Sequence, residues 1–381
     1  MYLPLHARGF LVVKIMSKER VLIEIDPTIP QPYWSYIKER NGNVARRIAS
    51  HLGIEFDHRP ADGVDRHAFF VPSKTLPKKA AHALGITTVH DFYGGAVEDL
   101  LHVSKSALHS RIRKDSNQPL AYSEKFAAQV ADVVLPGFTF FGVDEGFDAF
   151  TRLADQGYGL RLKKPNESDG AGQDLVTSIG HLRSLLGSLD PYFVSQNGMV
   201  LEVNLEDART TSAGIFYLGG ELYSQLARQK DIKMNGRTLY GGAVMRICRG
   251  GFDSLSRCSR GDNHSGLVIE QAGIIHERMG LFDPLVSRAS YDVLQGITSQ
   301  GEFLSGVTDI TYRLGGSSPA EVLALDYFRQ NPDIVFIDAD VTLDYNPIGA
   351  PAPNEVIFLD QPSLRITAKL LEVDNYSTRL I

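Results

Sequence analysis

The chain has 381 residues, more than the roughly 250–300 that one hydrophobic core usually serves, so we expect two or three lobes. A hydrophobic content of 43% and a charged content of 22% are ordinary for globular proteins, which excludes collagenous, coiled-coil and disordered chains. The formal net charge of -6 lacks the basic excess that favours binding to a phosphate backbone, so nucleic acid is not an expected partner.

The region near the N-terminus carries no targeting or membrane signal that we can identify. Its one apolar run, residues 9–16, contains Lys14 and is too short to span a bilayer, and no small-residue cleavage site follows it. A second start at Met16 would make the first fifteen residues an extension. Only Cys248 and Cys258 are present, which favours a reducing cytoplasm over a disulfide framework.

The first third of the chain alternates strands and a helix. Apolar periodicity predicts a strand at Val21–Ile25, an amphipathic helix at Pro32–Gly53 and a strand at Ala68–Val71. This order predicts an open α/β domain at the N-terminus. For the basic stretch between Leu101 and Lys125, we favour a solvated helix face or connector over a surface that binds an acidic ligand.

From Ser123 onward the predicted elements are shorter. Ser123 precedes Glu124 and an apolar-periodic run, which is typical of a helix start. A strand is expected within VLPGFTFFG, a helix at Asp144–Gln156, and a short strand that includes Leu160 and Leu162. The mixed α/β pattern therefore continues past the N-terminal third.

Two lysines and a glycine turn follow this short strand. Lys163 and Lys164 stand directly before a polar turn, Pro165–Gln173, that contains two glycines. Backbone N–H groups of such a turn can bind phosphate oxygens while a lysine supplies positive charge, and a plain hairpin loop is the alternative. Because the lysines precede the glycines, this is not a Walker loop, and no dinucleotide-binding fingerprint is in register.

The order of these motifs resembles that of the ATP-grasp superfamily. The run LRLKKPNESDGAGQ is similar to the glycine loop of the superfamily's small lid, and GMVLEVNLED is similar to the strand and hinge against which adenine lies. More narrowly, YGGAVMRICRGGFDSL and GVTDITYRLGGSSPAEVLALDYF resemble a bacterial family of unknown function with biotin-carboxylase-like character. The resemblance covers roughly residues 123–345 and implies an α/β (α+β), ATP-grasp-like fold. The implied parts are an N-terminal α/β domain at 1–122, a small lid at 123–205, a larger antiparallel-sheet domain for nucleotide and metal at 206–350, and a C-terminal strand or tail at 351–381.

The resemblance implies an ATP site in the lid and hinge. Lys163 would contact the nucleotide phosphates, Glu202 would take the adenine amino group, and Glu206 or Asp207 would take the ribose hydroxyls. The backbone of the hinge residues between them would face the edge of the adenine ring. The other members of the implied nucleotide set are Val203, Asn204, Leu205, Lys125, Lys164, Ser168, Asp169, Gly170, Gly172 and Gln173.

A third run, SYDVLQGITSQGEFLSGVTDITYRLGGSS, is similar to the paired metal-binding strands of the superfamily. By this resemblance, Asp292 and Asp309 are the carboxylates of a Mg²⁺ (or Mn²⁺) site. Thr311 completes the metal set where Asn is usual, and Arg313 keeps its place. Alternation along a strand puts Asp309, Thr311 and Arg313 on one face. Asp309 replaces the commoner Glu, so the motif supports ATP binding better than turnover.

Two more groups are candidates for anion binding. Arg246 alternates with apolar residues in a predicted strand and could face the nucleotide, with a cross-strand ion pair as the alternative. Ser317 or Ser318, directly before Pro319, predicts the start of a helix over Ala320–Phe328. That helix N-terminus could bind an anion or could simply be capped.

These motifs together predict a cytoplasmic ligase. ATP and Mg²⁺ would phosphorylate a small carboxylate to an acylphosphate, and an amine or related nucleophile would displace phosphate, with Lys163, Arg246 and Arg313 as catalytic groups. No membrane partner is expected, and the resemblance implies a homodimer. Two alternatives stay open. One is an ATP-binding regulatory protein that has lost catalysis, and the other is a nicotinamide-dependent oxidoreductase that would use the N-terminal domain, where the glycine fingerprint is missing.

Overall fold

A small parallel sheet begins the fold. The computed structural model describes residues 18–166, 172–234 and 236–371. Helix α1 buries Val44 and Ile48 against this sheet, as the predicted strand-helix-strand order requires, while β2 carries no apolar run and was not predicted. The elements are β1 (Arg20–Glu24), the 3-10 turn η1 (Gln31–Tyr33), α1 (Trp34–Leu52), β2 (Glu55–Pro60) and β3 (Ala68–Pro72), with strand order β2-β1-β3.

A second small sheet connects the N-terminal region to later parts of the chain. Ser287, which directly follows β13, donates through Oγ to Phe92 O at 2.5 Å and accepts from Gly94 N at 3.0 Å. The sheet has the order β13-β5-β4. Its surroundings comprise β4 (Leu76–Pro77), α2 (Lys78–Leu84), β5 (Gly95–Val97), η2 (Leu100–Val103), η3 (Lys105–Ala107) and β13 (Leu285–Val286).

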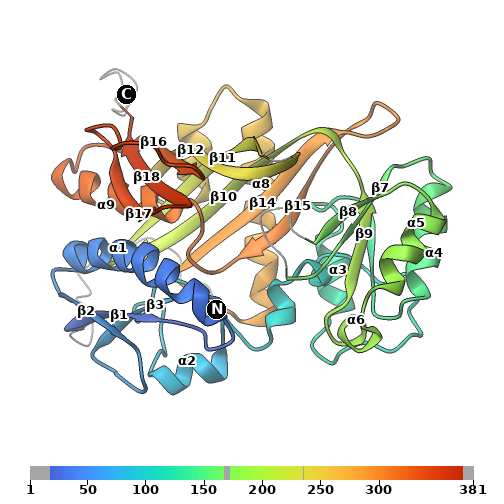
Figure 1. The fold of residues 1–381 in the computed structure, drawn as a ribbon, viewed down its shortest axis with the longest axis horizontal. Coiled ribbons are helices and arrows are strands. Elements are labelled where there is room, and N and C mark those ends of the chain that lie inside the picture. Colours follow the sequence, from blue (N-terminus) through green and yellow to red (C-terminus); the bar gives the residue numbers. More distant parts are fainter. Residues whose placement is uncertain (1–17, 167–171, 235, 372–381) are drawn as a thin grey trace.

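The middle of the chain forms a four-stranded antiparallel sheet, here called the lid sheet, with order β6-β9-β7-β8. Ser123 Oγ accepts from Phe126 N at 3.2 Å, so the predicted helix start is confirmed. Helices α4 and α5 pack on this sheet (Figure 1). Its elements are α3 (Glu124–Val130), β6 (Gly137–Phe140), α4 (Glu145–Ala154), β7 (Leu160–Lys163), β8 (Gln173–Val176), α5 (Ile179–Gly187), α6 (Pro191–Asn197) and β9 (Met199–Val203).

The largest element is an eight-stranded sheet of order β15-β14-β10-β11-β12-β16-β18-β17, and all its strand pairs are antiparallel. Strands β17 and β18 lie within the expected 351–381 tail, so the boundary expected at 350 does not coincide with an edge of the sheet. The elements are β10 (Glu206–Leu218), β11 (Glu221–Met234), β12 (Arg237–Arg249), α7 (Phe252–Cys258), α8 (Asn263–Arg278), η4 (Met279–Phe282), β14 (Arg288–Ile297), β15 (Phe303–Thr311), α9 (Ser318–Gln330), β16 (Phe336–Asp344), β17 (Val356–Gln361) and β18 (Leu364–Leu370).

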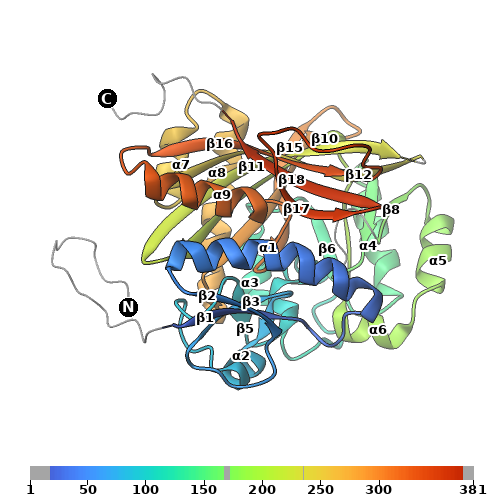
Figure 2. The ribbon, with the colours of Figure 1, turned by 60° about the vertical axis from the view of Figure 1, so that its left-hand side comes forward.

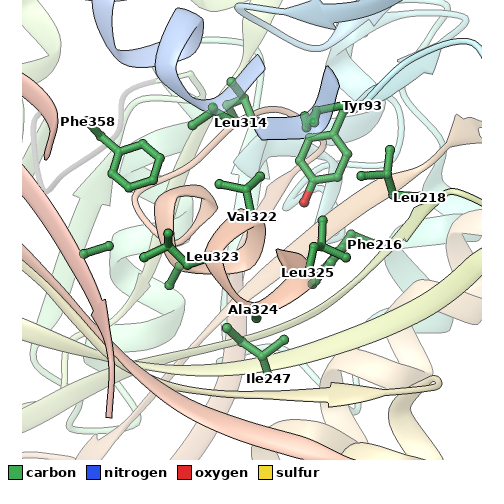
Figure 3. Close-up of a cluster of buried hydrophobic side chains, with 14 of the residues drawn as sticks. Tyr93, Phe216, Leu218, Ile247, Leu314, Val322, Leu323, Ala324, Leu325 and Phe358 are labelled. Atoms are coloured by element: carbon green, nitrogen blue, oxygen red, sulfur yellow. The ribbon is translucent and has the colours of Figure 1, made fainter. Parts of the chain in front are cut away.

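Helices cover both faces of the large sheet. Helix α9 lies between the sheet and α1 (Figure 2), and its apolar side chains pack with Ile247 and Phe358 (Figure 3). Cys248 points to the opposite face, toward α7 and α8, and is buried there as the sequence predicted. Within the part of the chain that the structure describes, no helix is long and apolar enough to cross a membrane.

Candidate active site

A cavity of about 310 Å³ lies where the lid sheet and the N-terminus of α9 meet the large sheet. Most of its wall comes from β10, β11, β12, β14 and β15, which contribute polar side chains on the α9 side of the sheet. The lid sheet and η3 complete it. Six predicted site residues line this cavity, namely Lys163, Gln173, Asp292, Asp309, Thr311 and Arg313.

Lys163 is held in place by a buried carboxylate. Lys163 and Glu202 are 3% and 1% exposed and form an ion pair between β7 and β9, and His109 Nε2 lies 3.3 Å from Glu202 Oε2. Burial works to raise the pKa of Glu202, but the Lys163 charge and the His109 hydrogen bond lower it to about 2. This corrects the expectation that Glu202 takes the adenine amino group, because its carboxylate is bound by Lys163 and His109 and positions the lysine.

Lys105 is a second buried lysine of the cavity, and the sequence interpretation missed it. Its Nζ lies 3.3 Å from Asp309 Oδ1. The basic stretch that we favoured as solvated is buried at Lys105, His109 and Arg111, so that expectation is wrong for these three residues. Lys125, predicted to bind nucleotide, is instead exposed on α3 and does not line the cavity. A lone lysine within the otherwise uncharged run LLHVSKSAL was the available signal.

The acidic side of the cavity spans three strands. Ser212, Asp292 and Asp309 are successive cross-strand partners on β10, β14 and β15, and Ser212 Oγ donates to Asp292 Oδ1 at 2.6 Å. Thr311 and Arg313 line the cavity with Asp309, as strand alternation predicts. Among residues 18–166, 172–234 and 236–371, no group of three or more His, Cys, Asp or Glu side chains is placed to hold a metal ion. The acidic group is therefore a carboxylate pair with hydroxyl neighbours.

The glycine turn connects β7 to β8 as a hairpin. Lys163 pairs with Gln173, Lys164 N donates to Gly172 O at 2.9 Å, and Gly172 has a φ of 61°. Lys164 does not line the cavity, whereas Gln173 does. Three predicted phosphate-binding residues, Ser168, Asp169 and Gly170, lie outside the described residues.

The predicted adenine hinge joins β9 to β10 beside the cavity without lining it. Val203 N donates to Pro136 O at 2.9 Å and Asn204 N donates to Gly159 O at 2.8 Å, so these two amides are already used. The side chain of Asn204 accepts from Arg161. Leu205 is buried and follows them in the hinge, and Glu206 and Asp207, predicted to take ribose hydroxyls, are exposed. The Leu205 backbone thus remains the candidate for the ring edge.

Arg246 does not belong to the cavity, which corrects its predicted catalytic role. Its guanidinium forms a bidentate pair with Asp338, at 2.8 and 2.7 Å, and lies over the Phe336 ring. Residues at positions 243, 245 and 247 of β12 face α9, so Arg246 points to the other side of the sheet. The cross-strand ion pair, left open as the alternative, is what the structure contains.

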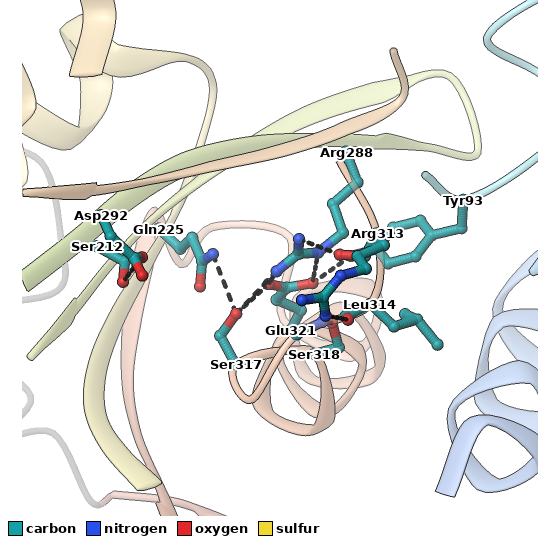
Figure 4. Close-up of polar contacts among 11 residues, drawn as sticks. Tyr93, Ser212, Gln225, Arg288, Asp292, Arg313, Leu314, Ser317, Ser318 and Glu321 are labelled. Atoms are coloured by element: carbon teal, nitrogen blue, oxygen red, sulfur yellow. Dashed lines mark hydrogen bonds and ion pairs between the residues drawn. The ribbon is translucent and has the colours of Figure 1, made fainter. Parts of the chain in front are cut away.

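A buried polar network supports the end of the cavity at α9 (Figure 4). Arg288, 1% exposed, donates to both carboxylate oxygens of Glu321, to Ser317 Oγ at 2.9 Å and to the backbone oxygen of Arg313 at 2.5 Å. Tyr93 donates to Glu321 at 2.6 Å. Burial works to raise the pKa of Glu321, but the Arg288 charge and these hydrogen bonds lower it.

This network changes the expectation for the start of α9. Ser317 occupies the N-cap position, but its hydroxyl donates to Glu321 Oε1 at 2.8 Å instead of capping the helix. Ser318 Oγ accepts from Gly315 N at 3.1 Å. The loop from Arg313 to Ser318 is therefore held by the buried side chains of Arg288 and Glu321, which no local sequence pattern predicts.

Comparison with solved structures identifies this architecture as an ATP-grasp fold. The biotin carboxylase domain of the Hydrogenobacter thermophilus 2-oxoglutarate carboxylase, a dimer in complex with MgADP, ADP and bicarbonate, matches with a TM-score of 0.52 and 12% identity over 93% of this chain and 86% of that chain. N5-carboxyaminoimidazole synthetase from Staphylococcus aureus matches with a TM-score of 0.50 and 13% identity over 93% and 94%. Biotin carboxylase from Campylobacter jejuni matches with a TM-score of 0.50 and 11% identity over 81% and 72%. Identities this low establish the fold alone.

The chain belongs to the family described as "Protein of unknown function (DUF3182)", which matches residues 36–368. This match begins in the first turn of α1 and ends within strand β18, so it includes every wall of the cavity. No curated protein matches the sequence. The predicted ATP-grasp-like fold and the narrower resemblance to a family of unknown function are both confirmed.

Proposed function

We propose that this protein is an ATP- and Mg²⁺-dependent carboxylate ligase. In this reaction ATP phosphorylates a small carboxylic acid to an acylphosphate, and an amine or related nucleophile displaces phosphate to form a C–N bond. The observation that carries the proposal is one cavity in which two buried lysines, Lys105 and Lys163, face two carboxylates, Asp292 and Asp309. Lysines neutralise phosphate charge and carboxylates hold a divalent cation, so the cavity has groups for both parts of Mg·ATP.

Asp292, Asp309 and their hydroxyl neighbours, here called the acidic row, offer oxygen ligands that fit Mg²⁺. This ion takes oxygen ligands and typically uses one or two carboxylates together with substrate phosphates and water. Asp292 and Asp309 would hold it, with the hydroxyl groups of Ser212 and Thr311 beside them. When bound, the ion neutralises charge that develops on the transferred phosphoryl group.

The protein's own residues mainly position and neutralise the reactants. Glu202 holds the Lys163 ammonium at the phosphates, and Lys105 can exchange Asp309 for a phosphate oxygen within the same cavity. Arg313, at the α9 end, suits the carboxylate of the acceptor because a guanidinium can bind it with two parallel hydrogen bonds. Fixed geometry of this kind lowers the entropic part of the barrier.

A catalytically impaired ATP-binding regulatory protein is the second candidate. The observation that favours it is the acidic row itself, because Asp309 already has Lys105 as a partner and Thr311 stands where Asn is usual. This candidate predicts nucleotide binding without release of ADP for any pair of acid and amine.

A nucleotide panel followed by a turnover screen tests the proposal. Mg·ATP at 100 times its Kd should stabilise the fold by about 2.7 kcal/mol, whereas NADH should not. Phosphate release is then screened with bicarbonate, amino acids and small diacids, each with and without amines. Phosphate release with one acid and one amine supports the ligase, binding without release supports the regulatory candidate, and failure of Mg·ATP to raise the unfolding temperature would remove both.

Matched lysine variants locate the activity. Lys163→Ala and Lys105→Ala should each abolish ATP turnover, and Lys105→Ala leaves the Lys163–Glu202 pair intact in case the first variant folds poorly. Lys164→Ala is the control, because its side chain does not line the cavity. Circular dichroism of each variant confirms folding. Equal turnover in wild type and Lys105→Ala would contradict the assignment of the phosphate site.

A further inference from the structure

Tyr240 of β12 forms a wall of the cavity beside Gly316. A Cβ built on Gly316 would lie 2.3 Å from Tyr240 Oη and 2.6 Å from Tyr240 Cζ, so the phenol ring rests directly on the backbone of this glycine. Gly316 does not have a positive φ, so its backbone conformation does not demand glycine. The space that the Tyr240 ring occupies is what excludes a larger residue there.

A β-bulge turns Tyr240 toward the cavity. Gln229 pairs with Ala243, and Asp231 pairs with Tyr240, so Gly241 and Gly242 together oppose Lys230 alone. In a regular strand Tyr240 would face away from the side that carries Ala243, because side chains alternate. The extra residue reverses this alternation, and Gln229, Asp231, Tyr240 and Ala243 all line the cavity.

The bulge depends on glycine. Gly242 has a φ of 110°, and a Cβ on it would lie 2.0 Å from Val341 O on the neighbouring strand. No other residue fits this position without moving the β12–β16 pairing. The backbone of Tyr240 is also fixed from outside the hairpin, since Tyr345 Oη donates to Tyr240 O at 3.0 Å. The backbone that carries the ring is thus fixed by the fold.

The chemistry at this end of the cavity suits an acid. Arg313 lines it beside the buried Arg288–Glu321 pair, and the N-terminus of the 13-residue helix α9 adds a partial positive charge. An acid bound by its carboxylate to Arg313 would share one cavity with Tyr240 and with the lysines and aspartates that the proposed function assigns to phosphate and metal. All of these must fit within about 310 Å³.

We propose that Tyr240 sets the size of the acid that this cavity accepts and restricts it to small acids. This rests on the proposed function, because it concerns the acceptor of the same reaction. Tyr240 is a specificity-determining residue here, since it limits the space for the body of the acid without holding its carboxylate. The bulk of the aromatic ring, which Tyr240→Phe retains, is the feature that the proposal assigns to this limit.

The test measures the binding of an acid series by ligand-observed NMR on the full chain with MgADP. The probes are formate, acetate, propionate, butyrate and valerate. Wild type should bind acetate and discriminate against butyrate by about 10-fold or more, the range that one or two methylenes command in a closed pocket. Tyr240→Ala should lose this preference, Tyr240→Phe should keep it, and Tyr240→Leu provides a second enlargement if the alanine variant folds poorly.

The control is Tyr192→Ala, which removes an exposed tyrosine on α6 and should leave the size preference unchanged. An unchanged acetate-to-butyrate ratio in Tyr240→Ala and Tyr240→Leu would overturn the proposal. So would the absence of binding for every acid in a protein that binds MgADP. Failure to bind MgADP itself is a separate result that contradicts the proposed function and removes this inference with it.

Discussion

At the scale of single residues, sequence motifs predict part of the cavity lining. The rest of the lining is known only from which side chains the fold buries. Lys163, Asp292 and Asp309 were predicted because they stand in runs whose order is characteristic. Lys105 was missed because it lies in a short 3-10 turn without periodicity, and only tertiary contacts make it 5% exposed. Lys125, predicted instead, is exposed because the short helix α3 buries Phe126, Ala127 and Val130 on its other side.

The Lys163–Glu202 pair makes a prediction for stability. Glu202→Gln leaves the Lys163 charge buried without its partner, so unfolding free energy at pH 7 should fall by about 3–5 kcal/mol. The pKa of Glu202 is lowered from 4.5 to about 2 in the folded protein, so its contribution is present above pH 4.5 and is lost as the pH falls toward 2. Urea unfolding at pH 7, 5 and 3 should show the gap between wild type and variant shrinking at pH 3.

The control for this prediction is Glu206→Gln, which changes an exposed glutamate four residues along the same hinge. It should behave like wild type at every pH. A gap between wild type and Glu202→Gln that stays constant from pH 7 to pH 3 would show that folding does not lower the pKa of Glu202, which contradicts this account of the ion pair.

At the scale of elements, the sequence predicts the presence of strands and helices more accurately than it predicts which face of each lines the cavity. Arg246 was placed correctly in a strand, yet alternation along β12 turns it toward Asp338 and away from the cavity. The same strand brings Tyr240 into the cavity only because Gly241 and Gly242 form a bulge. The register of β11 against β12, which decides both outcomes, depends on pairing between strands, and the two glycines alone do not predict it.

The buried Arg288–Glu321 pair should couple β14 to α9. Arg288→Met or Glu321→Gln alone should lower the unfolding free energy by about 3–5 kcal/mol, because each leaves the other group buried without a partner. The double variant should cost less than the sum of the two, with an interaction of about 0.5–3 kcal/mol in a double-mutant cycle measured by urea unfolding.

The partly exposed pair Arg365–Asp360 on β17 and β18 serves as the comparison for this cycle, and its interaction should stay near the 0–1 kcal/mol of surface pairs. Strictly additive costs for Arg288 and Glu321 would mean that the two side chains do not act as a unit, and that the loop carrying Arg313 is held by other contacts.

At the scale of the whole molecule, three distant parts of the chain build one cavity. Lys105 comes from the N-terminal third, Lys163 from the lid sheet, and the acidic row from the large sheet. The tip of the β14–β15 hairpin also touches the lid, since Ser299 Oγ accepts from Gly159 N at 3.1 Å and donates to Gly157 O. The order of motifs predicted the fold, whereas the convergence of Lys105, Arg288 and Tyr240 on one site depends on how these parts pack.

We propose that Asp309 and Asp292 hold a divalent cation that couples to ATP in this cavity. The most direct measurement is the Kd of ATP, by titration calorimetry with and without Mg²⁺, for wild type, Asp309→Asn and Asp340→Asn. Asp340 is the matched control, since it also pairs with a lysine and is about equally buried but lies on β16, outside the cavity. Mg²⁺ should tighten ATP binding in wild type and Asp340→Asn. In Asp309→Asn the affinity for Mg²⁺ should fall by at least roughly 10- to 100-fold, the loss that removal of a mere hydrogen-bond partner of a metal ligand already causes. An equal effect of Mg²⁺ on all three proteins would show that Asp309 does not hold the cation.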